Sequence, residues 1–317
     1  MITNPRPPDD VVLAAPPPSA PERTPRGIRW ARRRRAFLGF WRTYRQSRMG
    51  MVGLVIMVLF ILIALAAPIL VKPESLNVST PVGLPFQRPS ASFWLGTDDF
   101  GRSMIDLLIY GSRISLLVGF AATVVTMLVG TVVGISGGYY GGKIDVLMNG
   151  LTNWFLVIPW IALAIVLTSI LGPSLFNIIL VIGLTSWAGT ARLVRADTLS
   201  VKERPYVERA RALGAGNWHL VTRHVLPNVM PVIFANTVLT VALSILSETT
   251  LSLLGLGDPT KVSWGGIIND AFESGALSAG YWWWVIPPGV CICFVTLAFT
   301  MCGYALDEVL NPRIRER

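Results

Sequence analysis

The clearest candidate for nucleotide chemistry is a glycine–lysine pattern near the middle of the chain. Gly137 is followed after four residues by Gly142 and Lys143, as in the first seven positions of a phosphate-binding P-loop. The eighth position is Ile144, whereas a P-loop needs Ser or Thr there to bind Mg²⁺. An apolar run precedes the glycines where a P-loop has a β-strand. The pattern therefore favours a tight glycine turn, and we predict that this chain binds no ATP itself.

The histidines and cysteines do not form a catalytic or metal-binding pattern. His219 and His224 are five residues apart, which does not place them on one helix face, and no Cys, Asp or Glu completes a metal set. Cys291, Cys293 and Cys302 all lie in one apolar run, which indicates neither a disulfide framework nor a zinc site. We therefore expect no catalytic residue, no metal ligand and no enzymatic activity.

Composition indicates which elements must position any functional residue. The chain is 52% hydrophobic and 14% charged, whereas soluble proteins carry about 25% charged residues. Of 27 Lys and Arg residues, 11 lie before residue 50, and all of these are Arg. A nucleic-acid-binding tail is the alternative explanation for this basic arm. The arm leads directly into an uncharged run, which favours contact with anionic lipid and no nucleic-acid partner.

The fold class that follows is an all-α polytopic membrane protein with six transmembrane helices. Each apolar run is about as long as a membrane-spanning helix. Within them, Gly130 and Gly134 form a GxxxG pair that allows close approach of another helix, and Pro159 predicts a kink. The predicted spans are about 51–70, 114–135, 151–171, 172–191, 228–247 and 281–306.

The N-terminal region divides into three parts by composition. Residues 1–27 hold eight prolines and are expected to be a disordered tail. Residues 28–50 interleave Arg with aromatic residues, as in a basic interfacial helix. Residues 51–317 form the predicted transmembrane domain.

Charge asymmetry predicts the orientation in the bilayer. The segment 192–227 has seven Lys and Arg residues, whereas 248–280 has one. The positive-inside rule therefore places 192–227 and both termini in the cytoplasm, which six spans allow. The spans contain almost no ionisable residue, although ion-coupled carriers usually need some at mid-membrane. We therefore expect the energy for any transport to come from a partner protein.

The long polar interruption from Val201 to Asn228 reads as two short helices joined by a Gly-Ala-Gly turn. Pro205 suits the first position of a helix, and Gly214 suits its C-terminal αL position. Asn217 is expected to cap a second short helix that Pro227 stops. On the first helix, Tyr206, Ala210 and Leu213 share one face with Val207 beside them, and Arg204, Glu208 and Arg211 share another.

This interruption resembles the EAA loop of permease subunits in ATP-binding-cassette importers. The resemblance rests on the run from Tyr206 to Gly214 followed by Arg223 to Asn228, and it departs at Arg209, where the family usually has Ala. Further blocks resemble the second, C-type permease of the dipeptide, oligopeptide and nickel branch, from about residue 30 to the end of the chain. They are Leu95-Gly96-Thr97-Asp98 with Gly101-Arg102, Gly141-Gly142 with Asp145, Trp187 with Ala191-Arg192, Leu251 to Gly257, Trp264-Gly265, and Asn311-Pro312-Arg313.

The resemblance implies a type I importer permease fold, half of a translocation pore and a cytoplasmic coupling helix. It implies a second permease subunit, one or two cytoplasmic ATPase subunits that bind ATP and Mg²⁺, an extracytoplasmic solute-binding protein, and a prokaryotic plasma membrane. The implied ATPase-coupling residues within the loop at 201–228 are Tyr206, Val207, Glu208, Ala210, Arg211, Leu213 and Gly214.

Several alternatives remain open from the sequence. Glu208 meets either basic groups of the ATPase or Arg204 or Arg211 of its own helix. Asp98 and Glu248 are candidates for a far-side gate or loop, and Glu248 could equally be a solvated loop residue. The cargo is either peptides or nickel, opines or oligosaccharides. A six-span membrane scaffold or enzyme is the alternative outside transport.

Overall fold

The computed structural model describes residues 34–35, 38–79 and 82–310, in two units, Met1–Thr43 and Tyr44–Arg317. The predicted tail at 1–27 lies outside the described residues, as does part of the predicted interfacial helix at 28–50. Residues 38–43 are helical. A turn follows at 45–46, and Ser47 caps a new helix by accepting a hydrogen bond from the Gly50 N–H. The region up to residue 50 is therefore not one continuous helix.

In the described residues of the second unit, regular secondary structure is helical apart from one isolated β-bridge between Thr97 and Ser103. This agrees with the predicted all-α fold class. The helices are α2 (Arg48–Leu70), η1 (Pro73–Leu76), α3 (Met104–Tyr140), α4 (Gly142–Val157), α5 (Trp160–Leu171), α6 (Leu175–Lys202), α7 (Pro205–Ala212), α8 (Asn217–Leu220), η2 (Val221–Val225), α9 (Leu226–Leu251), η3 (Ser252–Leu256), α10 (Trp264–Glu273) and α11 (Trp282–Leu310).

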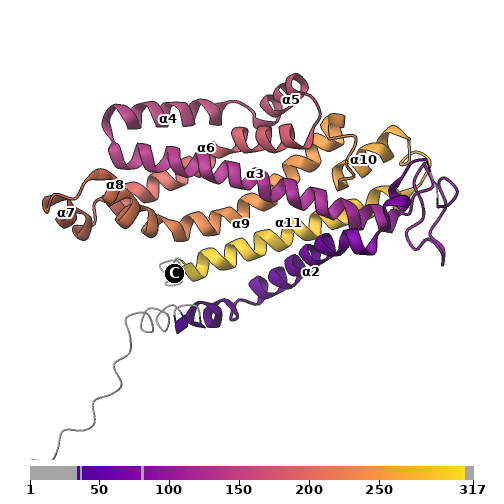
Figure 1. The fold of residues 1–317 in the computed structure, drawn as a ribbon, viewed down its shortest axis with the longest axis horizontal. Coiled ribbons are helices and arrows are strands. Elements are labelled where there is room, and N and C mark those ends of the chain that lie inside the picture. Colours follow the sequence, from indigo (N-terminus) through magenta and orange to yellow (C-terminus); the bar gives the residue numbers. More distant parts are fainter. Residues whose placement is uncertain (1–33, 36–37, 80–81, 311–317) are drawn as a thin grey trace, which may run out of the picture. The chain divides into compact units, whose positions relative to one another are not determined.

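Among the described residues, five helices are long and apolar enough to span a membrane, judged by length and composition. They are α2, α3, α6, α11 and the stretch Asn217–Leu256, which includes a kink at Gly255. The pair α4 and α5 passes the same test together but is bent by 89°, so the number becomes six if the pair is one span. Figure 1 shows α4 and α5 meeting at this bend.

The bend marks the largest difference from the expected helices. Pro159 was expected to kink a span at 151–171, but the helix before it begins at Gly142 and ends at Val157. Ile158 is extended, with φ −74° and ψ 127°, because a residue before proline is disfavoured in the α region. After the bend, α5 runs from Trp160 to Leu171. The span predicted at 172–191 begins only at Leu175, after the cap residue Ser174, and continues to Lys202.

Close packing of α3 against α6 confirms the role expected for the GxxxG pair. A Cβ added at Gly130 would lie 2.7 Å from Thr190, and one at Gly134 would lie 2.6 Å from the carbonyl oxygen of Ala191. Only glycine allows this approach. The P-loop-like pattern is a tight turn, as predicted, since Gly141 and Gly142 have φ of 69° and 53° between α3 and α4.

Two buried clusters hold the ends of this unit. One gathers Trp264, Trp283 and Trp284 with residues of α2, α3, α9 and α11. The other packs Val207 and Leu220 against α3, α6 and α9. Figure 1 shows α7 and α8 at one end of the unit and α10 at the opposite end. We call these the near end and the far end.

Candidate functional site

The near-end segment consists of α7, the turn at 213–216 and α8, and one side of it packs into a buried apolar cluster. Pro205 occupies the first turn of α7, where its missing N–H leaves no helical bond unmade. Val207 is completely buried and packs in the same cluster as Leu220 and Val225, which follow the turn. Ala210 packs against this cluster as well. The two sides of the turn are therefore tied to one apolar base.

Gly214 closes α7 as the sequence predicts. Its φ is +86°, the left-handed region that favours glycine. The Ala215 N–H donates to the Ala210 carbonyl at 3.1 Å, and the Gly214 N–H donates to the Arg211 carbonyl at 3.0 Å. These two bonds form a Schellman motif, which ends the helix and satisfies its last carbonyls.

The second helix of the segment differs from the expectation in two ways. Gly216, not Asn217, is the cap residue, and the Asn217 side chain instead accepts a hydrogen bond from the Tyr139 hydroxyl at 3.0 Å. Pro227 does not stop the helix, because η2 widens it into a π turn directly before α9. A wider turn accommodates the proline ring and its missing N–H, which an α turn would not.

The outer face of the segment exposes large apolar side chains. Leu213 is 89% exposed, Trp218 is 77% exposed and Tyr206 is 39% exposed. Sequence reasoning predicted a coupling role for Tyr206 and Leu213 and did not single out Trp218. The signal was available, since a tryptophan after a glycine turn in a polar segment is unusual for a solvated loop.

The charged residues of α7 stay exposed. Within the described part of the chain, Glu208 forms no ion pair with Arg204 or Arg211, so the local-pair alternative has no support there. The Arg211 guanidinium lies over the Tyr139 ring, 6.0 Å from its centroid. Arg209, the departure from the family pattern, is also exposed and leaves the buried side of α7 unchanged.

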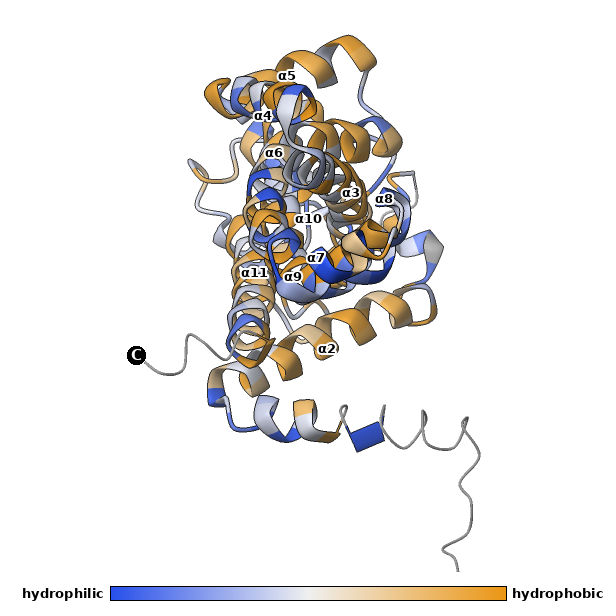
Figure 2. Cartoon of the chain, turned by 90° about the vertical axis from the view of Figure 1, so that its left-hand side faces the viewer, coloured by the Kyte–Doolittle hydropathy of each residue, from blue (hydrophilic) through white to orange (hydrophobic). Residues whose placement is uncertain are grey.

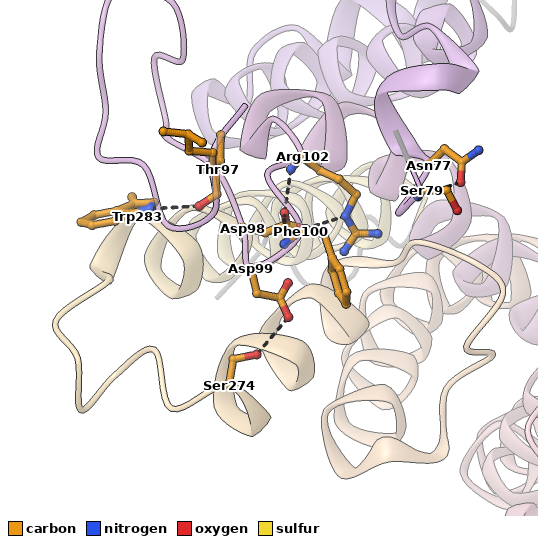
Figure 3. A network of polar contacts seen from close by, with 10 residues as sticks. Asn77, Ser79, Thr97, Asp98, Asp99, Phe100, Arg102, Ser274 and Trp283 are labelled. Carbon is orange, nitrogen blue, oxygen red and sulfur yellow. Dashed lines mark hydrogen bonds and ion pairs between the residues drawn. The ribbon is translucent and has the colours of Figure 1, made fainter. Parts of the chain in front are cut away.

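The far-end carboxylate Asp98 is buried and fully engaged, as Figure 3 shows. Its side chain accepts hydrogen bonds from the N–H groups of Phe100 at 3.0 Å and Arg102 at 2.7 Å. It also pairs with the Arg102 guanidinium, which is itself buried. Trp283 of α11 donates to the Thr97 carbonyl at 3.3 Å. Asp98 therefore holds the loop before α3 in place.

A second group of carboxylates lies beside this loop, at a recess of about 440 Å³. Asp99 accepts a hydrogen bond from the Ser274 hydroxyl at 3.2 Å (Figure 3). Desolvation raises the pKa of Asp270 from 3.8 to about 6. The nearby carboxylates Asp99 and Glu273 add to this increase, and the Arg102 guanidinium opposes it.

Glu248 lies inside α9 and is only 2% exposed, so the alternative of a solvated loop residue is wrong. Ser115 of α3 donates a hydrogen bond to its Oε2 at 3.1 Å, and Ser252 donates to its Oε1 at 2.8 Å. The Trp264 N–H at the start of α10 in turn donates to the Ser115 hydroxyl at 3.2 Å. Glu248 therefore connects α3, α9 and α10.

A cleft of about 660 Å³ opens beside the α4–α5 break, between α6 and α9. One wall is apolar and includes Phe155 and Trp160 at the break. The other wall carries hydroxyl and amide groups, and among the residues that the structure describes no charged side chain lines the cleft. These groups belong to Thr185, Ser186, Thr190, Asn236, Thr240, Ser244, Ser247 and Thr250.

Within residues 34–35, 38–79 and 82–310, no group of three or more His, Cys, Asp or Glu side chains is placed to hold a metal ion. The geometry thus presents a near-end apolar face, a neutral cleft and a far-end hydrogen-bonded network. Residues 130–316 match the family model described as "Binding-protein-dependent transport system inner membrane component". The chain belongs to this family.

Residues 37–87 of the permease also match the "N-terminal TM domain of oligopeptide transport permease C". The permease is 37% identical to the "Dipeptide transport system permease protein DppC" of Alkalihalophilus pseudofirmus, over 80% of this chain and 82% of the relative. It is 35% identical to the "Oligopeptide transport system permease protein OppC" of Bacillus subtilis, over 72% of this chain and 74% of the relative. Such permeases are transport subunits, and ATP hydrolysis belongs to separate subunits of the complex.

Among solved structures, the permease resembles a chain of the MetNI methionine ABC transporter in an inward-facing conformation. The TM-score is 0.53 at 18% identity, covering 66% of this chain and 97% of that chain. This similarity shows the fold of an ATP-binding-cassette importer permease, as expected from the sequence.

The polar wall of the cleft is a second feature of this permease that sequence reasoning missed. The spans were read only as apolar runs without ionisable groups. The signal was the spacing of Asn236, Thr240, Ser244 and Ser247 at intervals of three and four, which places them on one face of α9.

Proposed function

We propose that this permease forms half of the membrane pathway of an ATP-driven importer of dipeptides or oligopeptides, and that its near-end segment binds the ATPase. The observation that carries the proposal is the exposure of Leu213 and Trp218 on a turn whose base is buried. The names of the relatives, which refer to dipeptides and oligopeptides, support the cargo class.

The near-end segment has the features of a docking surface. Large exposed apolar side chains on a polar segment mark a protein interaction site. Burying Leu213 and Trp218 in a groove of a partner would remove their apolar surface from water. Because Val207 and Leu220 anchor the same segment in the core, movement of the bound partner would be passed to α6 and α9.

The neutral cleft suits a peptide cargo. Hydroxyl and amide groups along α6 and α9 can bond to peptide N–H and C=O groups of any sequence. Without charged side chains, the wall neither traps nor repels peptides whose own side chains carry charge. Nickel is disfavoured, because its usual ligands are imidazole or thiolate groups and the cleft offers neither.

The complete transporter would hold a second permease, one or two cytoplasmic ATPase subunits and an extracytoplasmic solute-binding protein. ATP and Mg²⁺ would bind in the ATPase subunits. The near end would face the cytoplasm together with both termini, following the Lys and Arg distribution. The permease would reside in a prokaryotic plasma membrane.

The experiment that tests the coupling role is Gly214→Asp in the assembled transporter. The left-handed φ costs about 1–2 kcal/mol for a residue with a Cβ, although no neighbouring atom lies within 4 Å of the added carbon. The chain should therefore still fold, while peptide uptake falls at least tenfold and ATP hydrolysis no longer responds to loaded binding protein.

The matched control is Gly216→Asp, two residues away. Gly216 has an ordinary φ of −69° at a helix N-cap, where Asp is favoured. The Gly216→Asp substitution adds the same charge to the same turn without backbone strain, so peptide uptake should remain near wild type. Normal uptake by both variants would refute the coupling role.

A further inference from the structure

We propose that Arg113 and an apolar groove between α2 and α3 form a binding site for an anionic phospholipid of the far-side leaflet. Arg113 is exposed on α3, and within the described residues it has no ion-pair or hydrogen-bond partner. The groove has a volume of about 270 Å³, and among the described residues that line it Arg113 is the one that carries a charge.

The groove matches the two parts of a phospholipid. Leu65 and Pro68 of α2 line one side, and Leu117 and Phe120 of α3 line the other, so an acyl chain finds only apolar contacts. The unpaired guanidinium presents a fork of donors that suits phosphate oxygens. An unpaired cation beside apolar side chains therefore favours a negatively charged headgroup over a purely apolar occupant.

The depth of Arg113 in the helix agrees with this assignment. Met104 begins α3 at the far end, and Arg113 lies nine residues later, about 14 Å along the axis. The residues after Arg113 are uncharged up to the end of α3. An arginine at this border directs its charged group towards the lipid phosphates while its stem stays among apolar side chains.

The neighbouring helix supports lipid rather than protein as the occupant. α2 exposes apolar residues along its length, including Val55, Leu62, Leu65 and Ile69, and Figure 2 shows it as a largely hydrophobic ribbon. A helix that is apolar on its exposed sides is expected in contact with acyl chains. A carboxylate of a second protein chain is the alternative partner for Arg113, and the experiment distinguishes the two.

The test uses the assembled transporter in nanodiscs of phosphatidylglycerol and phosphatidylcholine. Native mass spectrometry after release into detergent counts the retained phosphatidylglycerol. Arg113→Gln should retain about fivefold less, the factor that corresponds to about 1 kcal/mol per basic residue at an anionic surface. Arg113→Lys should retain an intermediate amount, because the charge remains but the fork of donors is lost.

Two controls separate the site from general effects. Arg88→Gln removes an exposed charge from the far-side loop and should leave retention unchanged. Leu117→Trp should fill the groove and lower retention, whereas Val124→Trp, at another exposed position of α3, should not. Equal retention by Arg113→Gln and wild type would overturn the proposal. So would loss of the second permease from the Arg113→Gln complex with lipid retention intact.

Discussion

The near and far ends of the permease use polar residues in opposite ways. At the near end, Glu208 is exposed and without an ion pair among the described residues, and Leu213 is almost fully exposed. At the far end, Asp98 and Glu248 are buried, and their oxygens accept hydrogen bonds from the protein itself. Asp98 and Glu248 are thus satisfied within the protein, whereas Glu208 and Leu213 stay available to a partner.

This difference separates stability from interaction. Removing one partner of a buried hydrogen-bonded carboxylate destabilises the fold, because the remaining buried polar group is left unsatisfied. An exposed side chain can be changed with little effect on the isolated chain. Substitutions at the far end should therefore alter folding, and those at the near end should alter assembly.

The largest effect is expected for Asp98→Ala. The substitution leaves the buried Arg102 guanidinium without its counter-charge, which costs about 3–5 kcal/mol in free energy of unfolding. Thermal unfolding of the purified permease in detergent measures the loss. Glu208→Ala removes the same charge at the exposed near end and is the control. The contrast between the ends fails if both variants unfold at the same temperature.

A smaller effect is expected for Glu248→Ala. The Ser115 and Ser252 hydroxyls lose their acceptor, which costs about 1–3 kcal/mol, and peptide uptake should fall with it. Glu248→Gln keeps an acceptor oxygen and the volume of the side chain. Uptake that survives Gln but not Ala assigns Glu248 to holding the helices together. Equal loss in both assigns it a charge-dependent role in a far-side gate, and unchanged uptake in Ala excludes both.

Leu213→Ser should leave the free energy of unfolding of the permease within about 0.5 kcal/mol of wild type, since the side chain is exposed. Its affinity for the ATPase subunit should fall about tenfold, as for a central apolar contact of an interface. Titration of the ATPase against the permease in nanodiscs measures this affinity. Arg209→Ala, which restores the usual family residue, should bind normally. Full affinity of Leu213→Ser would remove the near end as the docking surface.

The smallest effect concerns pH at the far end. The pKa of Asp270 is about 6 in the fold against 3.8 ordinarily, so the folded state holds a proton that the unfolded chain has lost between these values. This contribution to stability is present below about pH 4 and is lost as pH rises through about 6. The melting temperature of wild type should therefore fall slightly over this range relative to Asp270→Asn. Asp106→Asn serves as a charge control, and parallel curves for all three proteins would contradict the assignment.

Apolar patterning was enough to predict the helical membrane fold, and turn chemistry was enough for α7. Pro205 and Gly214 are local signals, because proline restricts its own φ and glycine permits the positive φ that ends the helix. The GxxxG pair also predicted a close helix contact correctly, because glycine has no Cβ and therefore lets a neighbouring helix come near.

Features set by tertiary contacts were less predictable. Asn217 has the right residue type for an N-cap, but the Tyr139 hydroxyl from α3 engages its side chain. Pro227 is a usual helix breaker, yet the π turn lets the helix continue through it. The buried Glu248 accepts hydrogen bonds from two serines. Ser115 of α3 lies far from it in sequence, and Ser252 of η3 lies beyond the predicted end of the span at residue 247.

The succession of α8, η2, α9 and η3, which departs from helical geometry at Gly255 near its end, connects the near end of the permease to the far end. The stretch Asn217–Leu256 has 40 residues and is therefore about 60 Å long if fully helical. It carries Trp218 near one end and Glu248 near the other. A tilt of about 5° pivoting at one end would displace the opposite end by about 5 Å, given the rise of 1.5 Å per residue. A small rotation at the near end would thus become a side-chain-sized displacement at the far end.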